Sequence, residues 1–322
     1  MKIIEVTLLF LGSVIGAGFA TGAEIITFFG HLRLPIWCIA LITGITMFAI
    51  IALEIFIYYP RNKQATTQNS KKPNLTSKFS DIITLLIYFI LFTAMTAGVT
   101  SVTNPYVAVI SLIVSTFIVF FGFNKLSRIN SWLVFVIIFL IITTAIPHLL
   151  NYNILQVSQW AHLPNGIFWG FLYAGLNCFM FPELIKAAAK QKKRKTLFWA
   201  GGLTAFLIMI LVGLILTIIK NCQVTSATIP LLAAAPTPIT MIIILLAILT
   251  SQYTALFAIM ERSSKLFPAM KNRPLTKAIG ICLCTLFTSF LGFSQIINFA
   301  YPLIGIFTCF FLLISWLKSL QA

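Results

Sequence analysis

The stretch GSVIGAGFATGAE, residues 12–24, decides how this sequence is interpreted. It lies within an apolar segment, Ile3–Phe29, that is long enough to cross a hydrocarbon layer about 30 Å thick. Four of its residues are glycine, and each glycine inside a helix costs about 1 kcal/mol relative to alanine. Irregular backbone at membrane depth is tolerated only where protein or a cavity surrounds it. A break in this helix therefore predicts a packed or functional site.

Two interpretations of this stretch remain open. Gly12 and Gly16 are four residues apart, as are Gly18 and Gly22, and this spacing also lets membrane helices pack closely. On the other hand, Thr21-Gly22-Ala23-Glu24 has the form of a capping box before the apolar run Ile25–Phe29. The capping box predicts that one half-helix ends near residues 12–15 and that a second begins near residue 21.

The composition is that of a membrane protein. Of the 322 residues, 60% are hydrophobic and 9% are charged, whereas soluble domains carry about 25% charged residues. We expect one all-α polytopic domain, residues 1–322, with the lipid bilayer as its main partner. The ten expected spans are Ile3–Phe29, Pro35–Tyr59, Phe79–Thr100, Pro105–Phe123, Ile129–Leu150, Pro164–Ala189, Thr196–Lys220, Pro236–Met260, Leu275–Leu291 and Gln295–Leu317.

The net charge of +16 is distributed as an orientation signal. With both termini cytoplasmic, the inner side collects Lys2, Lys318 and the basic runs at 61–78, 125–128, 186–195 and 262–277. Only Arg33 and Lys220 remain outside, which is a strong positive-inside pattern. We therefore expect a multi-pass protein of the cell membrane and no nucleic-acid partner. A cleaved signal peptide is disfavoured because Glu5 interrupts its apolar region.

The sixth span carries a second disruption. Its sequence FWGFLYAGLNCFMFPELIKAAA, residues 168–189, contains the polar residue Asn177 and then Pro182-Glu183. Proline is favoured in the first turn of a helix, and a carboxylate there meets the positive end of the helix dipole. Transporters built from two inverted repeats have interrupted helices at corresponding places in both halves. We therefore predict a five-plus-five arrangement, with repeats of roughly 1–150 and 160–318 and with the first and sixth helices broken.

The segment GSVIGAGFATGAEIITFF, residues 12–29, resembles the first helix of the YkvI-type membrane proteins. This group belongs to the amino acid–polyamine–organocation superfamily, which is similar to the LeuT-fold sodium-coupled transporters. The resemblance is sharp over residues 7–29 and coarse elsewhere. It implies a fold in which the first and sixth helices unwind around a central substrate, and in which the first and eighth helices hold a sodium ion.

In sodium-coupled members of that superfamily, an A-x-x-T-S segment of the eighth helix binds the ion. Ala247-Ile248-Leu249-Thr250-Ser251 fits this pattern, and its first, fourth and fifth residues share one helical face. With carbonyl groups from Gly12 and Ile15, the resemblance implies five neutral oxygen ligands. The alternative is that both hydroxyls bond back to carbonyls of their own helix.

Proton coupling is the other hypothesis for the coupling ion. Intramembrane carboxylates are functional candidates by default, but four of the six acidic residues lie near cytoplasmic ends of spans, and Glu24 and Glu183 have structural roles at half-helix starts. The fifth span also lacks the lysine that replaces sodium in some proton-coupled relatives. Sodium is therefore favoured. The acidic residues are Glu5, Glu24, Glu54, Asp81, Glu183 and Glu261.

The expected cargo is a small neutral or zwitterionic solute, because no Lys or Arg lies at mid-membrane depth. The resemblance points to an amino acid or a related amine, carried by alternating access. The predicted substrate-binding residues are Ala17, Gly18, Phe19, Ala20, Thr21, Tyr173, Asn177 and Phe179, with Thr93 and Thr96 as weaker candidates. Glu5, Arg262 and Lys265 are predicted to form a cytoplasmic gate.

Other functional classes fit less well. Nothing in the sequence resembles a catalytic centre, so we do not expect an enzyme or an organic cofactor. A channel and a ligand sensor that uses a transporter fold both remain open, and they differ from a carrier in flux saturation and in net transport. The sequence makes no prediction about the oligomeric state.

Overall fold

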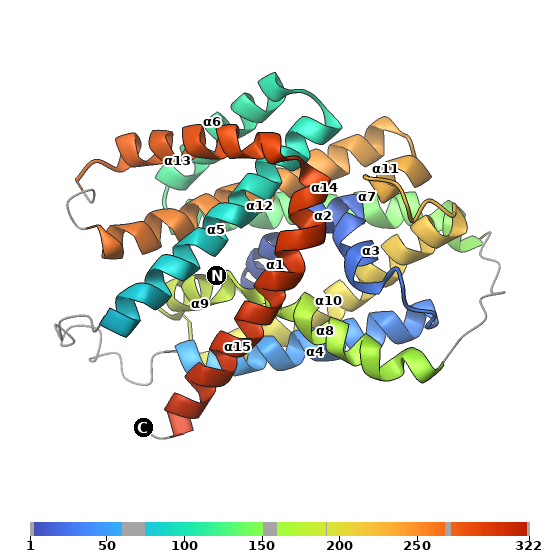
Figure 1. Cartoon of the computed structure of the whole chain (residues 1–322), viewed down its shortest axis with the longest axis horizontal. Coiled ribbons are helices and arrows are strands. Elements are labelled where there is room, and N and C mark those ends of the chain that lie inside the picture. The colour runs from blue at the N-terminus through green and yellow to red at the C-terminus, as the bar shows by residue number, and fades with distance from the viewer. Residues whose placement is uncertain (1–2, 60–74, 151–159, 191, 268–271, 321–322) are drawn as a thin grey trace.

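The computed structural model describes residues 3–59, 75–150, 160–190, 192–267 and 272–320. Helices make up nearly all of these residues, and none of them lies in a strand (Figure 1). The first half contains α1 Ile3–Val14, α2 Ala17–Thr21, α3 Ala23–Phe29, α4 Ile36–Tyr58, α5 Leu75–Val102, α6 Pro105–Phe120 and α7 Phe123–Leu150. The second half contains α8 Leu163–Cys178, α9 Phe181–Ala189, α10 Arg194–Asn221, α11 Pro230–Ala234, α12 Pro238–Leu266, α13 Pro274–Thr288, α14 Phe293–Gln295 and α15 Tyr301–Leu320.

Several helices are long and apolar enough to cross a membrane. Within the described residues, seven pass this test singly, and α8 with α9 form an eighth candidate that is bent by 52°. The short helices α1 and α6 have 12 and 16 residues and do not pass singly. The protein is therefore a multi-pass membrane protein, while the ten-span count and the inverted five-plus-five repeat remain predictions.

The bundle has a clear centre and periphery. α12 is the most enclosed of the long helices, with 78% of its most apolar window buried, whereas the corresponding share of α7 and α13 is 22%. α1 packs against α7, α10 and α12 in the middle of the bundle, while α6 and α13 run along one edge (Figure 1). Large apolar side chains such as Trp132 and Phe135 are exposed on α7, as expected for a surface that faces lipid.

The first apolar segment is broken twice rather than once. α1 ends at Val14, Gly16 has extended backbone, and a short helix, α2, ends at Gly22, whose φ of 76° is left-handed. Gly22 then also starts α3. Glycine adopts this conformation without the steric penalty that a Cβ would bring. The break in the sixth segment lies between Cys178 and Phe181, and a proline stands in the first turn of α9.

The predicted capping box at residues 21–24 is wrong. Gly22, which has no side chain, occupies the capping position of α3. The Thr21 hydroxyl donates to the carbonyl groups of Ala17 and Gly18 at the end of α2, at 2.7 and 3.2 Å. Its oxygen also accepts from the Ala23 amide at 3.3 Å, rather than from the Glu24 amide that a capping box would use. The Glu24 side chain contacts Asn177 on α8.

Candidate functional site: the helix breaks and their surroundings

The break after α1 leaves carbonyl groups without their usual helical donors. The amide of Gly16 would normally bond to the carbonyl of Gly12, but it bonds to Val14 at 2.8 Å. The carbonyl oxygens of Gly12 and Ile15 accept instead from hydroxyl groups of α12. Buried carbonyl groups need such partners, so the break is stabilised by contacts from outside its own segment.

The five groups of the predicted sodium site lie together. Ser251 Oγ lies 2.9 Å from the Ile15 carbonyl oxygen and 3.4 Å from that of Gly12, and Thr250 Oγ1 lies 3.3 Å from the Ile15 oxygen. Both hydroxyls also contact the Ala247 carbonyl oxygen, at 2.8 and 3.2 Å. The two hydroxyls thus bond both to a carbonyl of their own helix and to carbonyls at the break after α1. Bonding back to α12 and contributing to a site at the break are therefore not exclusive alternatives. Thr250 and Ser251 are fully buried.

Asn130 on α7 supports this arrangement, and the sequence analysis missed it. Its Nδ2 donates to the Leu8 carbonyl at 2.7 Å, and its Oδ1 accepts from the Tyr253 hydroxyl at 2.7 Å. A Cβ on Gly12 would lie 2.7 Å from Asn130 Cγ and closer still to its two terminal atoms. Any larger residue at position 12 would therefore displace the Asn130 amide. The only signal in the sequence was a polar residue near the start of an apolar span.

Met95 on α5 fills the other side of the break. Its sulfur lies 3.3 Å from the amide nitrogen of Ala17, at the start of α2. A Cβ on Gly16 would approach the Met95 methyl group to 2.8 Å and the Ser251 hydroxyl oxygen to 2.9 Å. Gly12 and Gly16 thus serve both interpretations of the sequence, since they permit close packing and they permit the break.

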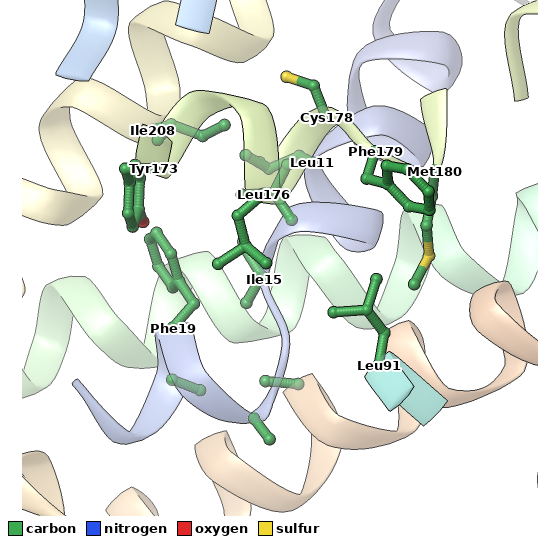
Figure 2. Packing of buried hydrophobic residues seen from close by; sticks show 14 of the residues in the cluster. Leu11, Ile15, Phe19, Leu91, Tyr173, Leu176, Cys178, Phe179, Met180 and Ile208 are labelled. Atoms are coloured by element: carbon green, nitrogen blue, oxygen red, sulfur yellow. The ribbon is translucent and has the colours of Figure 1, made fainter. Parts of the chain in front are cut away.

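The predicted substrate residues divide into two places. Ala17, Gly18, Phe19, Ala20 and Thr21 form α2, and all five are buried. Figure 2 shows the ring of Phe19 beneath that of Tyr173, and the side chain of Leu176 pointing toward Ile15. Phe179 lies elsewhere, because its ring packs on Tyr88 of α5 at 5.1 Å. Tyr173 packs on Phe28 and Phe29 of α3, with ring centroids 5.6 and 5.3 Å apart, so the structure brings Tyr173 to the first broken segment and does not bring Phe179 there.

Glu24 and Asn177 connect the two broken segments. Asn177 Nδ2 donates to Glu24 Oε1 at 2.5 Å and to the Tyr173 carbonyl at 3.0 Å. Both side chains are more than nine-tenths buried. The hydroxyl groups of Tyr173 and Tyr301 are buried as well, and neither has a hydrogen-bond partner among the described residues. The sequence analysis singled out Asn177, gave Glu24 a structural role, and missed Tyr301.

The weaker candidates on α5 face other helices. Thr93 Oγ1 lies 3.0 Å from the hydroxyl of Thr288 on α13. Thr96 accepts from the Gln252 side chain at 3.3 Å, and Gln252 in turn accepts from Ser115 on α6 at 3.1 Å. These hydroxyls therefore join helices around α12 rather than line the space beside α2.

Arg262 is the centre of an ion-pair cluster, which we define as Asp81, Glu183, Lys186 and Arg262. Arg262 Nη1 lies 2.8 Å from Glu183 Oε1, and its Nη2 lies 2.8 Å from Asp81 Oδ1. Lys186 contacts the same Glu183 oxygen at 3.3 Å. The cluster joins α5, α9 and α12. Of the other predicted gate residues, Glu5 lies in the first turn of α1, and the side chain of Lys265 lies outside the described residues.

Comparisons with known proteins identify the fold and no family. Neither a protein-family model nor a curated protein matches the chain. The chain is similar to the Eremococcus coleocola manganese transporter in complex with an aromatic bis-isothiourea substituted compound, with a TM-score of 0.61 and 13% identity over 98% of this chain and 78% of that one. Two structures of mutants of that transporter give TM-scores of 0.61 and 0.60 at 14% identity. The chain therefore has the fold of this membrane transporter.

Proposed function

We propose that the protein is a secondary transporter that couples a sodium ion to the movement of a small neutral or zwitterionic solute by alternating access. The observation that carries the proposal is the convergence of Thr250 and Ser251 on the carbonyl groups freed by the break after α1. Transporters of this kind use unwound carbonyl groups for the ion and half-helix starts for the solute. The five-plus-five repeat and the resemblance to YkvI-type proteins belong to this proposal.

The spacing of the five oxygens suits a small hard cation. Ligands at right angles around an ion at about 2.3–2.6 Å, as for calcium, lie about 3.3–3.7 Å apart. Three of the observed hydroxyl–carbonyl distances, 3.2, 3.3 and 3.4 Å, come within about 0.1 Å of this range or inside it. All five distances, from 2.8 to 3.4 Å, are also those of hydrogen bonds. Binding would therefore turn the two hydroxyl protons away from the carbonyl oxygens.

The ligand set favours a singly charged ion over manganese. All five oxygens are neutral, so they supply no compensating negative charge for a divalent ion. Transition-metal sites in proteins use His, Cys and carboxylate ligands, and within the described residues no group of three or more His, Cys, Asp or Glu side chains could hold a metal ion. The likeness to a manganese transporter thus extends to the fold and, in this proposal, not to the cargo.

Proton coupling through Glu24 is the second candidate. Its carboxyl group is buried between the two broken segments, and its hydrogen bond from Asn177 brings no positive charge. Burying a charge without a counter-charge is expensive, so a proton or a cationic part of the solute would stabilise Glu24 there.

The test is uptake of radiolabelled neutral amino acids into liposomes that contain the purified protein. Three inward gradients are compared, namely sodium, potassium and protons. We expect saturable uptake of at least one solute with sodium, and its loss in the variant Thr250→Ala/Ser251→Ala. Thr254→Ala is the matched control, because the Thr254 hydroxyl bonds only to the Thr250 carbonyl of its own helix, at 2.7 Å, among the described contacts. Uptake driven by protons alone would favour Glu24, and non-saturating flux in all three conditions would favour a channel.

A further inference from the structure

Glu54 on α4 is a buried carboxyl group without a partner. It is fully buried, and neither of its oxygens has a hydrogen-bond partner within the described part of the chain. Burying an ionised carboxylate without hydrogen-bond donors carries a very large desolvation cost. Nothing in the sodium site or between the two broken segments uses this residue, so its presence needs another explanation.

Glu54 faces a cavity of about 80 Å³ between α4, α5, α9, α12 and α15. A cavity of this size has room for water. Its polar lining offers partners to such waters. The polar and charged residues of the lining are Glu54, Tyr58, Thr84, Tyr88, Lys186, Arg262, Thr308 and Ser315.

The cations around this cavity are paired with other carboxylates. Among the described residues, Lys186 and Arg262 are the cations that line it, and both pair with Glu183 of the ion-pair cluster. Arg262 also pairs with Asp81. Neither oxygen of Glu54 has a hydrogen-bond partner within the described part of the chain. Neutralising Glu54 therefore requires a positive charge at its own carboxyl group.

A proton meets this requirement better than a metal ion. A metal ion needs several oxygen ligands and would lie beside the positive charges of Lys186 and Arg262, which repel it. A proton binds to a Glu54 oxygen and needs neither space nor further ligands. The titratable and charged groups around Glu54 are Tyr58 on α4, Tyr88 on α5, Cys178 on α8, Glu183 and Lys186 on α9, Arg194 on α10, Arg262 on α12 and Cys309 on α15. Arg194 lies over the ring of Phe56, which is on α4.

A route for the proton passes Lys186. This lysine and Glu183 also line a wide pocket of about 770 Å³ that borders α9, α12 and the residues before α7. Lys190 and Glu261 on the rim of that pocket are exposed. Lys186 therefore lines both the Glu54 cavity and a pocket that has exposed residues in its lining, whereas Glu183 lines only the pocket.

We propose that Glu54 is a proton-binding site whose occupancy is linked to the ion-pair cluster. Glu54 holds a proton while Lys186 pairs with Glu183. When α9 moves and Lys186 turns to Glu54, the O–H bond of the carboxyl group breaks, the proton passes to a water in the cavity, and the carboxylate pairs with the lysine, which keeps its own proton. Closure of the cluster and protonation of Glu54 then stabilise each other. This site is separate from the sodium site of the proposed function.

The test compares the pH dependence of unfolding for the purified full chain in detergent, from about pH 5 to about pH 9. The unfolded carboxyl group loses its proton near pH 4.3, so a folded state that keeps the proton loses stability as pH rises. Relative to Glu54→Gln, the wild-type unfolding constant should rise up to about tenfold per pH unit. Glu261→Gln, which changes an exposed carboxylate on α12, should keep the wild-type slope.

Infrared difference spectra supply an independent readout. The difference between the wild-type and Glu54→Gln spectra should contain the carbonyl band of a protonated carboxylic acid, to which Glu24, present in both proteins, does not contribute. Lys186→Gln removes the lysine that would pair with ionised Glu54, so this variant should keep the carboxylic-acid band to a higher pH than the wild type. If Glu54→Gln does not fold, Lys186→Gln provides the test instead. The double variant Thr250→Ala/Ser251→Ala should keep the wild-type slope, whatever becomes of sodium coupling.

Two results would overturn the proposal. The first is a Glu54→Gln protein with the same pH slope and the same infrared band as the wild type. The second is a slope that is absent in sodium or potassium and appears only when choline replaces them, because the cavity would then hold an alkali ion in place of the proton.

Discussion

Substitution of Gly12 by alanine tests whether Asn130 holds the end of α1 in place. The new methyl group would lie 2.7 Å from Asn130 Cγ, so the side chain of Asn130 must move. Overpacking of this kind costs about 1–3 kcal/mol. The movement also breaks the bonds of Asn130 to Leu8 and Tyr253, and each buried polar group left without a partner costs about 1–3 kcal/mol. We expect Gly12→Ala to lower the free energy of unfolding by at least about 3 kcal/mol.

Thermal unfolding in detergent measures this loss, with Gly213→Ala as the matched control. A Cβ on Gly213 in α10 meets only the Ala40 Cβ, at 3.6 Å, which is an ordinary contact. This control should be neutral or more stable by up to about 1 kcal/mol, from helix propensity. The double variant Gly12→Ala/Asn130→Ala should lose less than the sum of its single variants, because the methyl group then has room. Equal stability of Gly12→Ala and Gly213→Ala would refute the reasoning.

Three further substitutions test the surroundings of the breaks. Gly22→Ala forces a Cβ onto left-handed backbone, and it should lower the free energy of unfolding by about 1–3 kcal/mol in thermal melts; an unchanged melting temperature would contradict the double break. Asn177→Leu removes the described donor to Glu24 and should cost about 1–3 kcal/mol, whereas Glu24→Gln keeps an acceptor for Asn177 and should cost less. Arg262→Gln leaves Glu183 without its closest cation. It should cost about 2–4 kcal/mol and speed backbone hydrogen exchange in α9, and unchanged exchange there would argue against a gate.

Local chemistry made the helix breaks predictable. Glycines disfavour a continuous helix wherever they gather, and Pro182 favours a helix start in any membrane protein, so both breaks could be expected from their own residues. The shared face of Ala247, Thr250 and Ser251 follows from helix geometry. Their meeting with the break after α1 was implied by the resemblance, and the structure places those groups within 3.4 Å.

Tertiary partners decided what the sequence could not predict. The pattern at residues 21–24 favours a capping box. In the structure the Thr21 hydroxyl donates to carbonyl groups of α2, and the Glu24 carboxyl group accepts from Asn177. Asn130 near the start of a span gave no sign that it would reach the end of α1. The ion-pair cluster likewise depends on three helices that are far apart in sequence, so Arg262 was predicted at the gate without its partners, Asp81 and Glu183.

The thermal stability of the purified protein in sodium against potassium, at equal ionic strength, tests the central claim most directly. A ligand that binds only the folded state stabilises it by mass action, by about 2.7 kcal/mol at a concentration 100 times its Kd. We predict a sodium-specific rise in Tm for the wild type and for Thr254→Ala, and none for Thr250→Ala/Ser251→Ala. The absence of a sodium-specific rise in the wild type up to molar concentrations, or an equal rise in the double variant, would contradict a sodium site at the break after α1.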